Sequence, residues 1–525
     1  MTDSQNGEPG SAAAAAGGIP GARVAGATEV VDKGLSGNSV GLIGGITLGI
    51  SCVAPAYTLT ATLGLVAVVA GFKMPIVFIA GFLPMFFAAY AYREFNRVAP
   101  DCGTSFTWTT KAFGPYLGWL GGWAAILATI IVLANLAGVA VQFFYQLLGD
   151  LFGSESLSAL WETKWVNVLT CLAFLAIATA VAYRGITTTE KVQYILVGFQ
   201  MVVLVVFAVM AIAKSGGGVT GGAAFSWDWF NPLSGFTLTA FIAGLSASIF
   251  SFWGWDSALT VNEESKDAAR TPGRAALLCV VSILLTYLLV SVASLMFAGV
   301  GEEGIGLSNP DTQANVFGAL AGPVLGEGWK LFLFLAVLAS SAASLMTTFL
   351  PTTRTMLGMA AYKALPARFA QVHPRYLTPG YGTVVAGLVA GAFYTLLTIL
   401  SEDTLTDTIL SLGLMICFYY SLTALGCVWF FRRELFTNAH NIVFKFLFPL
   451  IGGLGLLFVF LITLRDSTAP DYGSGEVFGI GVVAVIGVGL LVLGGVLMLV
   501  MRVRQPDFFL GRTLRRDTPA LILED

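Results

Sequence analysis

The stretch that decides the fold is Phe250–Glu264, FSFWGWDSALTVNEE, because it places an acid inside a long apolar run. Residues 237–262 are long and apolar enough to cross a hydrocarbon layer of ~30 Å as a helix. Asp256 lies within this run, two residues after Gly254. A carboxylate at membrane depth costs about 3 kcal/mol on insertion scales, so it persists where it faces protein or water. The stretch therefore predicts an interrupted membrane helix whose acid points away from lipid.

The composition of the whole chain agrees with this reading. Of its 525 residues, 56% are hydrophobic and only 11% are charged, and the mean hydropathy is +0.82. These values lie far outside the range of ordinary soluble domains. Only helices and closed barrels satisfy every backbone polar group in lipid, and the apolar runs here have the length of helices. We predict an all-α polytopic membrane protein.

Twelve apolar runs predict twelve transmembrane helices. They lie at 39–67, 74–97, 117–148, 166–183, 191–213, 237–262, 274–299, 329–350, 380–400, 406–431, 443–464 and 477–502. Residues 1–36 are rich in Gly, Ala, Ser and Pro, which predicts a disordered cytoplasmic tail. The transmembrane domain is then 37–502, and 503–525 form a C-terminal cytoplasmic tail.

The basic residues predict the orientation of the chain. An even number of spans puts both termini on one side. With the termini in the cytoplasm, all but five of the 27 lysines and arginines fall on the cytoplasmic side. The five exceptions are Lys73, Lys164, Lys214, Lys330 and Arg465. This strong asymmetry predicts a multi-pass protein of the cell membrane with cytoplasmic N and C termini.

Two of the predicted helices are interrupted near their middle. The first contains Pro55, which removes a backbone donor and crowds the preceding turn, and the sixth contains Gly254. Each opens a set of five helices, a pattern typical of a 5+5 inverted repeat with two further C-terminal helices and a binding site at the breaks. The candidate substrate-binding residues are Ile50, Ser51, Cys52, Val53, Ala54, Pro55, Phe250, Ser251, Trp253, Gly254, Trp255 and Asp256.

Asp256 allows three interpretations. It could anchor a substrate ammonium group that Phe250, Trp253 and Trp255 cap by cation–π contact. It could instead carry a proton through the transport cycle. The structural alternative is that it accepts hydrogen bonds from loosened backbone or caps the second half of helix six. The sequence alone leaves these three open.

The break in the first helix predicts a complementary anion site. Where a helix resumes, free N–H groups and the positive end of the helix dipole face the cavity. We expect Ser51, Cys52, Val53 and Ala54 to expose such groups. A cavity that had this anion site at one end and Asp256 at the other would suit the two charged groups of an amino acid zwitterion.

Other polar residues near the membrane have functional and structural interpretations. Glu263 and Glu264 could pair with Lys266, Arg270 and Arg274 as a cytoplasmic gate, or could belong to a solvated loop. Hydroxyl groups on the eighth helix could coordinate Na⁺ or serve close helix packing; they are Ser340, Ser341 and Ser344. We expect the polar side chains of the third and fifth helices to hydrogen-bond across helices; they are Asn135 and Gln200.

Several classes of function lack support in the sequence. Five of the six cysteines lie in apolar runs, both histidines lie in polar loops, and no phosphate-binding loop or HExxH motif occurs. We therefore expect no catalytic residues, no metal, no cofactor and no nucleic acid partner. The expected partners are a small-molecule substrate and the lipid bilayer. A sensor that binds without transporting is a further alternative, but the chain has only short extramembrane pieces.

Three segments resemble the amino acid–polyamine–organocation (APC) superfamily of permeases. They are AYREFNRVAPDCGTSFTWTTKAFGPYLGWLGGW (Ala91–Trp123), FWGWDSALTVNEESKDAARTP (Phe252–Pro272) and TTRTMLGMAAYKALPARFAQVHPRYLTPGYGT (Thr352–Thr383). The resemblance implies a secondary transporter that moves amino acids or amines by alternating access, coupled to protons or by exchange. It also places the binding residues at the breaks of helices one and six.

The sequence departs from many amino acid carriers of that family in two places. Ile50, Ser51 and Cys52 stand where those carriers have a glycine–small–glycine motif. Gln200, fifteen residues after Gly185, stands where several proton-coupled relatives have a lysine. With Asp256, both departures are similar to the putrescine-uptake branch. Amino acid transport, with polyamine uptake as the alternative, is the function that the resemblance implies.

Overall fold

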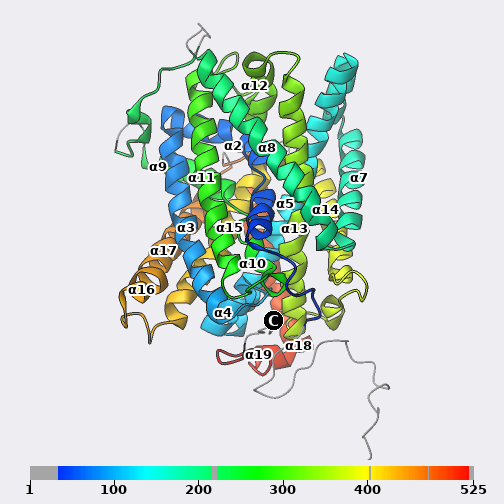
Figure 1. The fold of residues 1–525 in the computed structure, drawn as a ribbon, viewed down its shortest axis with the longest axis vertical. Helices are drawn as coiled ribbons and strands as arrows, with labels where there is room; N and C mark the ends of the chain where they lie inside the picture. The colour runs from blue at the N-terminus through cyan, green and yellow to red at the C-terminus, as the bar shows by residue number, and fades with distance from the viewer. Residues whose placement is uncertain are drawn as a thin grey trace, which may run out of the picture.

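The computed structural model describes residues 33–215, 221–233, 235, 237–400, 404–470 and 472–519. In these residues the protein is a bundle of long helices, most of which run along the vertical direction of Figure 1. Most of the predicted N-terminal tail, residues 1–32, lies outside the described part. The all-α membrane fold predicted from the apolar runs is confirmed.

The long helices overlap the predicted spans, but some ends differ, and α13 continues to Ala361, beyond the predicted end at residue 350. In chain order they are α1 (Leu42–Val53), α2 (Pro55–Ala70), α3 (Met74–Val98), α5 (Pro115–Phe152), α7 (Lys164–Tyr183), α8 (Ile186–Lys214), α9 (Leu238–Ser251), α11 (Thr271–Ala298), α13 (Lys330–Ala361), α14 (Gly380–Leu400), α15 (Thr404–Phe430), α17 (Phe448–Asp466) and α18 (Val482–Arg504). Short elements join them: α4 (Ser105–Phe113), α6 (Glu155–Ser158), α10 (Ser257–Thr260), α12 (Val316–Leu325), α16 (Ala439–Asn441), α19 (Pro506–Phe509) and the antiparallel strands β1 (Glu476–Val477) and β2 (Ile480–Gly481).

The predicted number of twelve spans is not confirmed. Ten helical segments of the described residues are long and apolar enough to cross a membrane. One of them, Leu42–Val98, covers the first two predicted spans. The sixth predicted span holds only a short apolar helix, Ala240–Ser251, because the chain leaves helical geometry at Ser251.

Both interruptions lie where the sequence predicts them. α1 ends at Val53, Ala54 takes the left-handed conformation with φ 53° and ψ 67°, and Pro55 starts α2. Proline suits this first position because its missing N–H would have no helical partner there. In the sixth span, α9 ends at Ser251 and Gly254 has φ +111° before the short α10.

The helices differ in how deeply they lie in the bundle. In the most apolar window of α5, 89% of residues are buried, against 22% in α7 and 39% in α14. α5 packs on α13 and α15, whereas α7 and α14 pack on each other at one side of the bundle (Figure 1). α5 is therefore a core helix, and α7 and α14 present apolar side chains to lipid.

The chain segments at both ends of the transmembrane domain pack against the same end of the bundle. Lys33, within the predicted N-terminal tail, is 5% exposed, so the folded part begins before residue 37. In the predicted C-terminal tail, the ring of Phe508 in α19 lies 5.4 Å from that of Phe106 in α4. Lys111 donates a hydrogen bond to the carbonyl of Thr518 at 2.5 Å. We name this end of the bundle the terminal end.

Candidate functional site at the two helix breaks

The two breaks touch each other through their backbones. A Cβ atom on Gly254 would lie 3.0 Å from the carbonyl carbon of Cys52 and 3.0 Å from the nitrogen of Val53. Only glycine permits so close an approach together with φ +111°. The structure therefore brings together residues of the two candidate stretches that lie about 200 positions apart in the sequence.

Hydroxyl groups of α13 bind the first break. Ser344 donates a hydrogen bond to the carbonyl of Cys52 at 2.9 Å. The Ser340 Oγ accepts one from the N–H of Tyr57 at 3.3 Å. These serines satisfy backbone groups that the broken helix leaves without helical partners. The Ser341 Oγ is buried without a hydrogen-bond partner in the described part of the chain.

The predicted set of free N–H groups at this break is wrong. Ser51, Cys52 and Val53 lie within α1, so their N–H groups belong to the regular helical pattern. The N–H of Ala54 donates to the carbonyl of Ile50 at 2.9 Å. The reason is that α1 keeps its hydrogen bonds to its last residue and the chain breaks only at Ala54. The anion site expected from these four residues is therefore not formed in this conformation.

Gln193 of α8 is a further polar side chain that joins the first break to neighbouring helices. The Ser51 hydroxyl donates to Gln193 Oε1 at 2.6 Å, and Gln193 Nε2 donates to the carbonyl of Ala343 in α13 at 3.2 Å. This amide therefore bridges three helices. Gln193 was not among the residues that the sequence singled out; in this helix the sequence singled out Gln200, where several proton-coupled relatives have a lysine.

The expectations for the other two amides had different outcomes. Asn135 Oδ1 accepts a hydrogen bond from Thr408 of α15 at 2.7 Å, so its predicted cross-helix bond is confirmed. The same prediction for Gln200 is wrong, because both polar atoms of its buried side chain lack hydrogen-bond partners among the described residues. Gln200 lies about two turns along α8 from Gln193, away from the break that supplies hydrogen-bonding groups.

The aromatic candidates of the second break pack against α15. The indole N–H of Trp253 donates to the Tyr419 hydroxyl at 2.7 Å. The Trp255 ring stacks on Tyr420 with centroids 5.2 Å apart and planes at 19°. Phe250, Trp253 and Trp255 are all at least 96% buried. These contacts hold the irregular segment between α9 and α10 in place.

Asp256 is a buried carboxylate with no basic partner. It is 7% exposed and forms no ion pair with any described residue. Although Asp256 is the N-cap residue of α10, its side chain makes no capping hydrogen bond. Its neighbours include Cys52 of α1, Tyr92 of α3, and Tyr419 and Tyr420 of α15, and the Tyr420 hydroxyl lies within hydrogen-bonding reach of the carboxylate. The acid therefore lies buried where four helices meet, without a base among the described residues.

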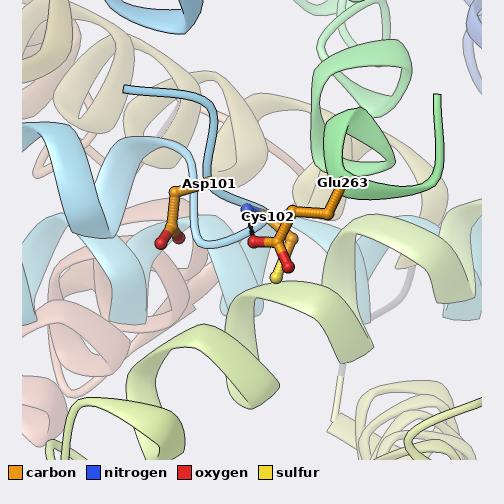
Figure 2. Close-up of side chains that lie close together, drawn as sticks. All are labelled: Asp101, Cys102 and Glu263. Atoms are coloured by element: carbon orange, nitrogen blue, oxygen red, sulfur yellow. Dashed lines mark hydrogen bonds between the residues drawn. The ribbon is translucent and has the colours of Figure 1, made fainter. Parts of the chain in front are cut away.

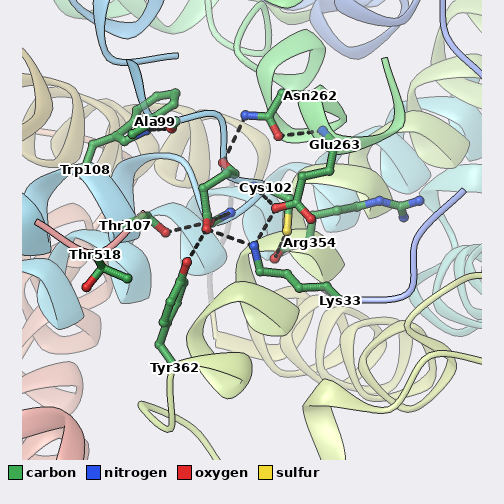
Figure 3. A network of polar contacts seen from close by, with 12 residues as sticks. Lys33, Ala99, Cys102, Thr107, Trp108, Asn262, Glu263, Arg354, Tyr362 and Thr518 are labelled. Atoms are coloured by element: carbon green, nitrogen blue, oxygen red, sulfur yellow. Dashed lines mark hydrogen bonds and ion pairs between the residues drawn. The ribbon is translucent and has the colours of Figure 1, made fainter. Parts of the chain in front are cut away.

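Glu263 and Glu264 contrast with Asp256, because each has a basic partner. Figure 3 shows Glu263 beside Lys33. Lys33 Nζ lies 2.5 Å from Glu263 Oε1 and 2.8 Å from Asp101 Oδ2. Arg354 of α13 holds Glu264 through two hydrogen bonds of 3.0 Å each. Both glutamates are at most 2% exposed. The interpretation of these two acids as a solvated loop is therefore wrong.

The partners of these glutamates also differ from the expected ones. Lys266, Arg270 and Arg274 are exposed and form no ion pair within the described residues. The reason is a turn at Asp267, whose φ is +51°, which carries the following residues away from the glutamates. Long-range partners, from the N-terminal segment and from α13, take their place.

Three residues around Lys33 have the spacing of a metal site, but Lys33 already supplies a positive charge to their carboxylates. Ligand atoms of Asp101, Cys102 and Glu263 lie within 4.8 Å of one another (Figure 2). Burial lowers the pKa of Lys33, but the neighbouring carboxylates outweigh this effect and hold its pKa well above the usual value. Burial also raises the pKa of the Cys102 thiol, and a protonated thiol is a poor metal ligand. The ammonium group thus supplies the cation that the carboxylates need.

Lys33 does not affect the two carboxylates equally. Burial would raise the pKa of Asp101, but Lys33 and hydrogen bonds from Tyr362 and Thr107 lower it below its usual value. For Glu263, burial outweighs Lys33 and the pKa is raised. Asp101 is therefore the acid that is firmly ionised. The sequence missed Lys33, Asp101 and Arg354 as site residues because nothing near them in the chain signals a partner.

Comparison with known proteins places these features in context. A family model described as amino acid permease matches residues 34–488. The low-affinity putrescine importer PlaP of Escherichia coli K12 is 24% identical over 417 residues, which cover 78% of this chain and 85% of that protein. The branched-chain amino acid permease BcaP of Lactococcus lactis is 23% identical over 406 residues, covering 71% and 78%. The crystal structure of MhsT in complex with L-phenylalanine has the same fold, with a TM-score of 0.61, 12% identity and coverage of 81% of this chain and 99% of that one.

Proposed function

This chain belongs to the amino acid permease family, and from that premise we propose that it moves amino acids across the cell membrane by alternating access. The observation that carries the proposal is Asp256, a buried acid at the contact of two broken helices with no basic partner among the described residues. Burying a charge without a partner is costly. A substrate ammonium group or a proton would remove this cost.

Polyamine uptake is the second candidate, and one observation favours it. The N–H groups of Ser51–Ala54, which were expected to bind a substrate carboxylate, are hydrogen-bonded within and at the end of α1. A diamine needs an acid but no anion site. The similarity to a putrescine importer supports the same candidate.

For the transport cycle we propose that Asp256 is either the amine anchor or the proton carrier, and that the paired glutamates form a cytoplasmic gate. The pairs Lys33–Glu263 and Arg354–Glu264 join the N-terminal segment, the chain after α10, and α13. They would separate when the pathway opens to the cytoplasm. Coupling to protons and exchange of solutes are both compatible with this cycle.

The test is uptake into liposomes by wild type, Asp256→Asn and the control Asp267→Asn, which changes an exposed acid. The labelled solutes are cationic, neutral and acidic amino acids, putrescine and spermidine, each with and without an inward proton gradient. If Asp256 anchors an amine, wild type accumulates amines or cationic amino acids and Asp256→Asn loses binding. If Asp256 carries the proton, Asp256→Asn still exchanges substrate but loses gradient-driven accumulation.

Two results would contradict the proposal. Unchanged binding and accumulation in Asp256→Asn would remove Asp256 from the mechanism. Binding of a solute to purified wild type without any accumulation or exchange in liposomes would support a sensor instead. Asp267→Asn is expected to match wild type in every assay.

A further inference from the structure

A groove runs along the outer surface between α7 and α14. None of the residues that line it belongs to the two helix breaks. Its volume is about 1160 Å³, and its lining is mostly apolar. Small residues create it: Ala176 and Ala180 of α7 and Ala392 of α14 line it and are exposed. Side chains of ordinary size at these positions would fill the groove.

Two glycines set the distance between the helices that form the groove. A Cβ on Gly387 would lie 2.2 Å from Thr179 Oγ1, and one on Gly391 would lie 2.8 Å from Leu172 Cδ2. Glycines four positions apart often bring two chains together in a membrane. Here they are used for packing α14 on α7 within one chain, so this motif is not free to bind a second copy.

The groove has the position and length that suit an acyl chain. α7 and α14 lie at one side of the bundle (Figure 1), and most residues of their apolar windows are not buried. Along α7 the lining extends from Leu172 to Arg184, which is roughly 18 Å at 1.5 Å per residue. This is more than half of a hydrocarbon layer of ~30 Å. One leaflet's acyl chain could therefore lie along it.

One end of the groove is basic and aromatic. Arg184, Tyr183 and Tyr376 line it there, and the guanidinium of Arg375 lies 5.6 Å from the centre of the Tyr376 ring. Neither arginine forms an ion pair with a residue that the structure describes. Tyrosine and arginine are typical of the headgroup level of a membrane. Among the described residues, two arginines without acidic partners therefore lie at this end of the apolar groove, Arg184 in its lining and Arg375 beside Tyr376.

This basic end is held in a defined shape. Thr378 donates a hydrogen bond to the carbonyl of Tyr183 at 2.8 Å, which fastens the loop before α14 to the end of α7. His373 Nδ1 accepts from the N–H of Arg375 at 3.2 Å. These hydrogen bonds fix the backbone from which the two arginine side chains extend.

We propose that this groove binds an anionic phospholipid, with an acyl chain along Ala176 and Ala392 and the phosphate group against Arg184 and Arg375. With the predicted orientation, the lipid belongs to the cytoplasmic leaflet, which is the anionic one in many membranes. An amphiphile with an apolar tail and a negative head matches both halves of the groove. The site is independent of the transported substrate and of Asp256.

The first test is native mass spectrometry of the full-length protein with equal amounts of phosphatidylglycerol and phosphatidylcholine. Wild type is expected to retain more phosphatidylglycerol than phosphatidylcholine. The double variant Arg184→Gln/Arg375→Gln is expected to lose about 25-fold in apparent affinity, at about fivefold per arginine near the surface. The matched control Arg502→Gln/Arg504→Gln, at the exposed end of α18, is expected to keep wild-type retention.

The second test blocks the groove and leaves the arginines in place. Ala176→Phe puts a large ring into the groove, whereas Ala173→Phe changes an exposed alanine of the same helix that does not line it. Only Ala176→Phe is expected to lower phosphatidylglycerol retention. Thermal unfolding in detergent checks that each variant is folded, and if Ala176→Phe is not, the arginine variants decide alone.

Three outcomes would overturn the proposal. Equal retention of phosphatidylglycerol and phosphatidylcholine by wild type would show that the arginines do not favour an anionic lipid. Retention that survives Arg184→Gln/Arg375→Gln would place the lipid elsewhere. A dimer in wild type that disappears in Ala176→Phe, without a change in bound lipid, would show that a second copy covers the groove.

Discussion

At the residue scale, three acids of one stretch have different electrostatic surroundings. Glu263 faces Lys33 and Glu264 faces Arg354, whereas Asp256 faces aromatic rings and hydroxyl groups without a base among the described residues. A paired buried acid stabilises one conformation, but an unpaired one is available for a ligand. This difference separates the candidate binding acid from the candidate gate acids.

Lys33→Met should destabilise the protein strongly. The substitution keeps much of the side-chain volume but leaves Asp101 and Glu263 buried without their shared cation. Breaking a buried pair from one side typically costs about 3–5 kcal/mol. We expect a clearly lower midpoint of thermal unfolding in detergent. Lys266→Met, which changes an exposed lysine, should leave the midpoint unchanged.

A partial rescue would identify the cause of that loss. Adding Asp101→Asn to Lys33→Met removes the acid whose pKa Lys33 lowers, so the double variant should regain part of the midpoint. Equal midpoints for Lys33→Met and Lys266→Met would mean that the ion pairs at the terminal end contribute little to stability.

At the element scale, the essential feature is the backbone contact between the breaks. Ala54 and Gly254 both have positive φ, at +53° and +111°. Ser344 and Ser340 of α13 hold the first break, and rings of α15 hold the second. α13 and α15 therefore form a frame in which the broken helices meet.

Gly254→Ala should impair this contact. A methyl group at this φ strains the backbone by about 1–3 kcal/mol and would press on Cys52 and Val53 at 3.0 Å. Initial rates of uptake into liposomes are expected to fall at least tenfold, with only a modest change in the unfolding midpoint. Gly198→Ala in α8 has open space around its Cβ position and no positive φ, so it should transport as wild type does. If Gly254→Ala transported at the same rate as Gly198→Ala, the close backbone contact between the two breaks would not be needed for transport.

At the scale of the whole molecule, the chain segments flanking the transmembrane domain pack against the same end of the bundle. The N-terminal segment enters the ion-pair cluster through Lys33, and α19 packs beneath α4. The side chain of Thr513 donates to the carbonyl of Tyr362, whose hydroxyl binds Asp101. Both segments therefore contribute to the structure that surrounds the proposed gate.

The predicted orientation can be measured with introduced cysteines. All six native cysteines are buried, so labelling background should be low. Leu233→Cys, at a position that is 92% exposed, is expected to react with a membrane-impermeant maleimide in intact cells. Arg504→Cys, exposed at the end of α18, is expected to react only after permeabilisation. The reverse pattern would place the termini outside.

The apolar runs by themselves determined that this is a helical membrane protein, and Pro55 and Gly254 determined where two of its helices break. These are local properties, because span length and backbone freedom depend on neighbouring residues. The number of spans differs from the prediction, because an apolar run can continue through a break at which the helix ends, as it does after Ser251. The cost of a charge in lipid likewise placed Asp256 in the interior.

Only the tertiary structure decided which groups meet. Lys33 binds Asp101 and Glu263, which lie 68 and 230 positions away in the sequence. Ser51 binds Gln193, which lies 142 positions away. The neighbouring sequence pointed to Lys266, Arg270 and Arg274 as partners of the glutamates, and it gave no sign of Gln193. A charged or polar side chain carries no sequence signal for a distant partner, because the partner is selected by how the helices pack. The sequence therefore determines which residues must avoid lipid, and the packing determines what each of them binds.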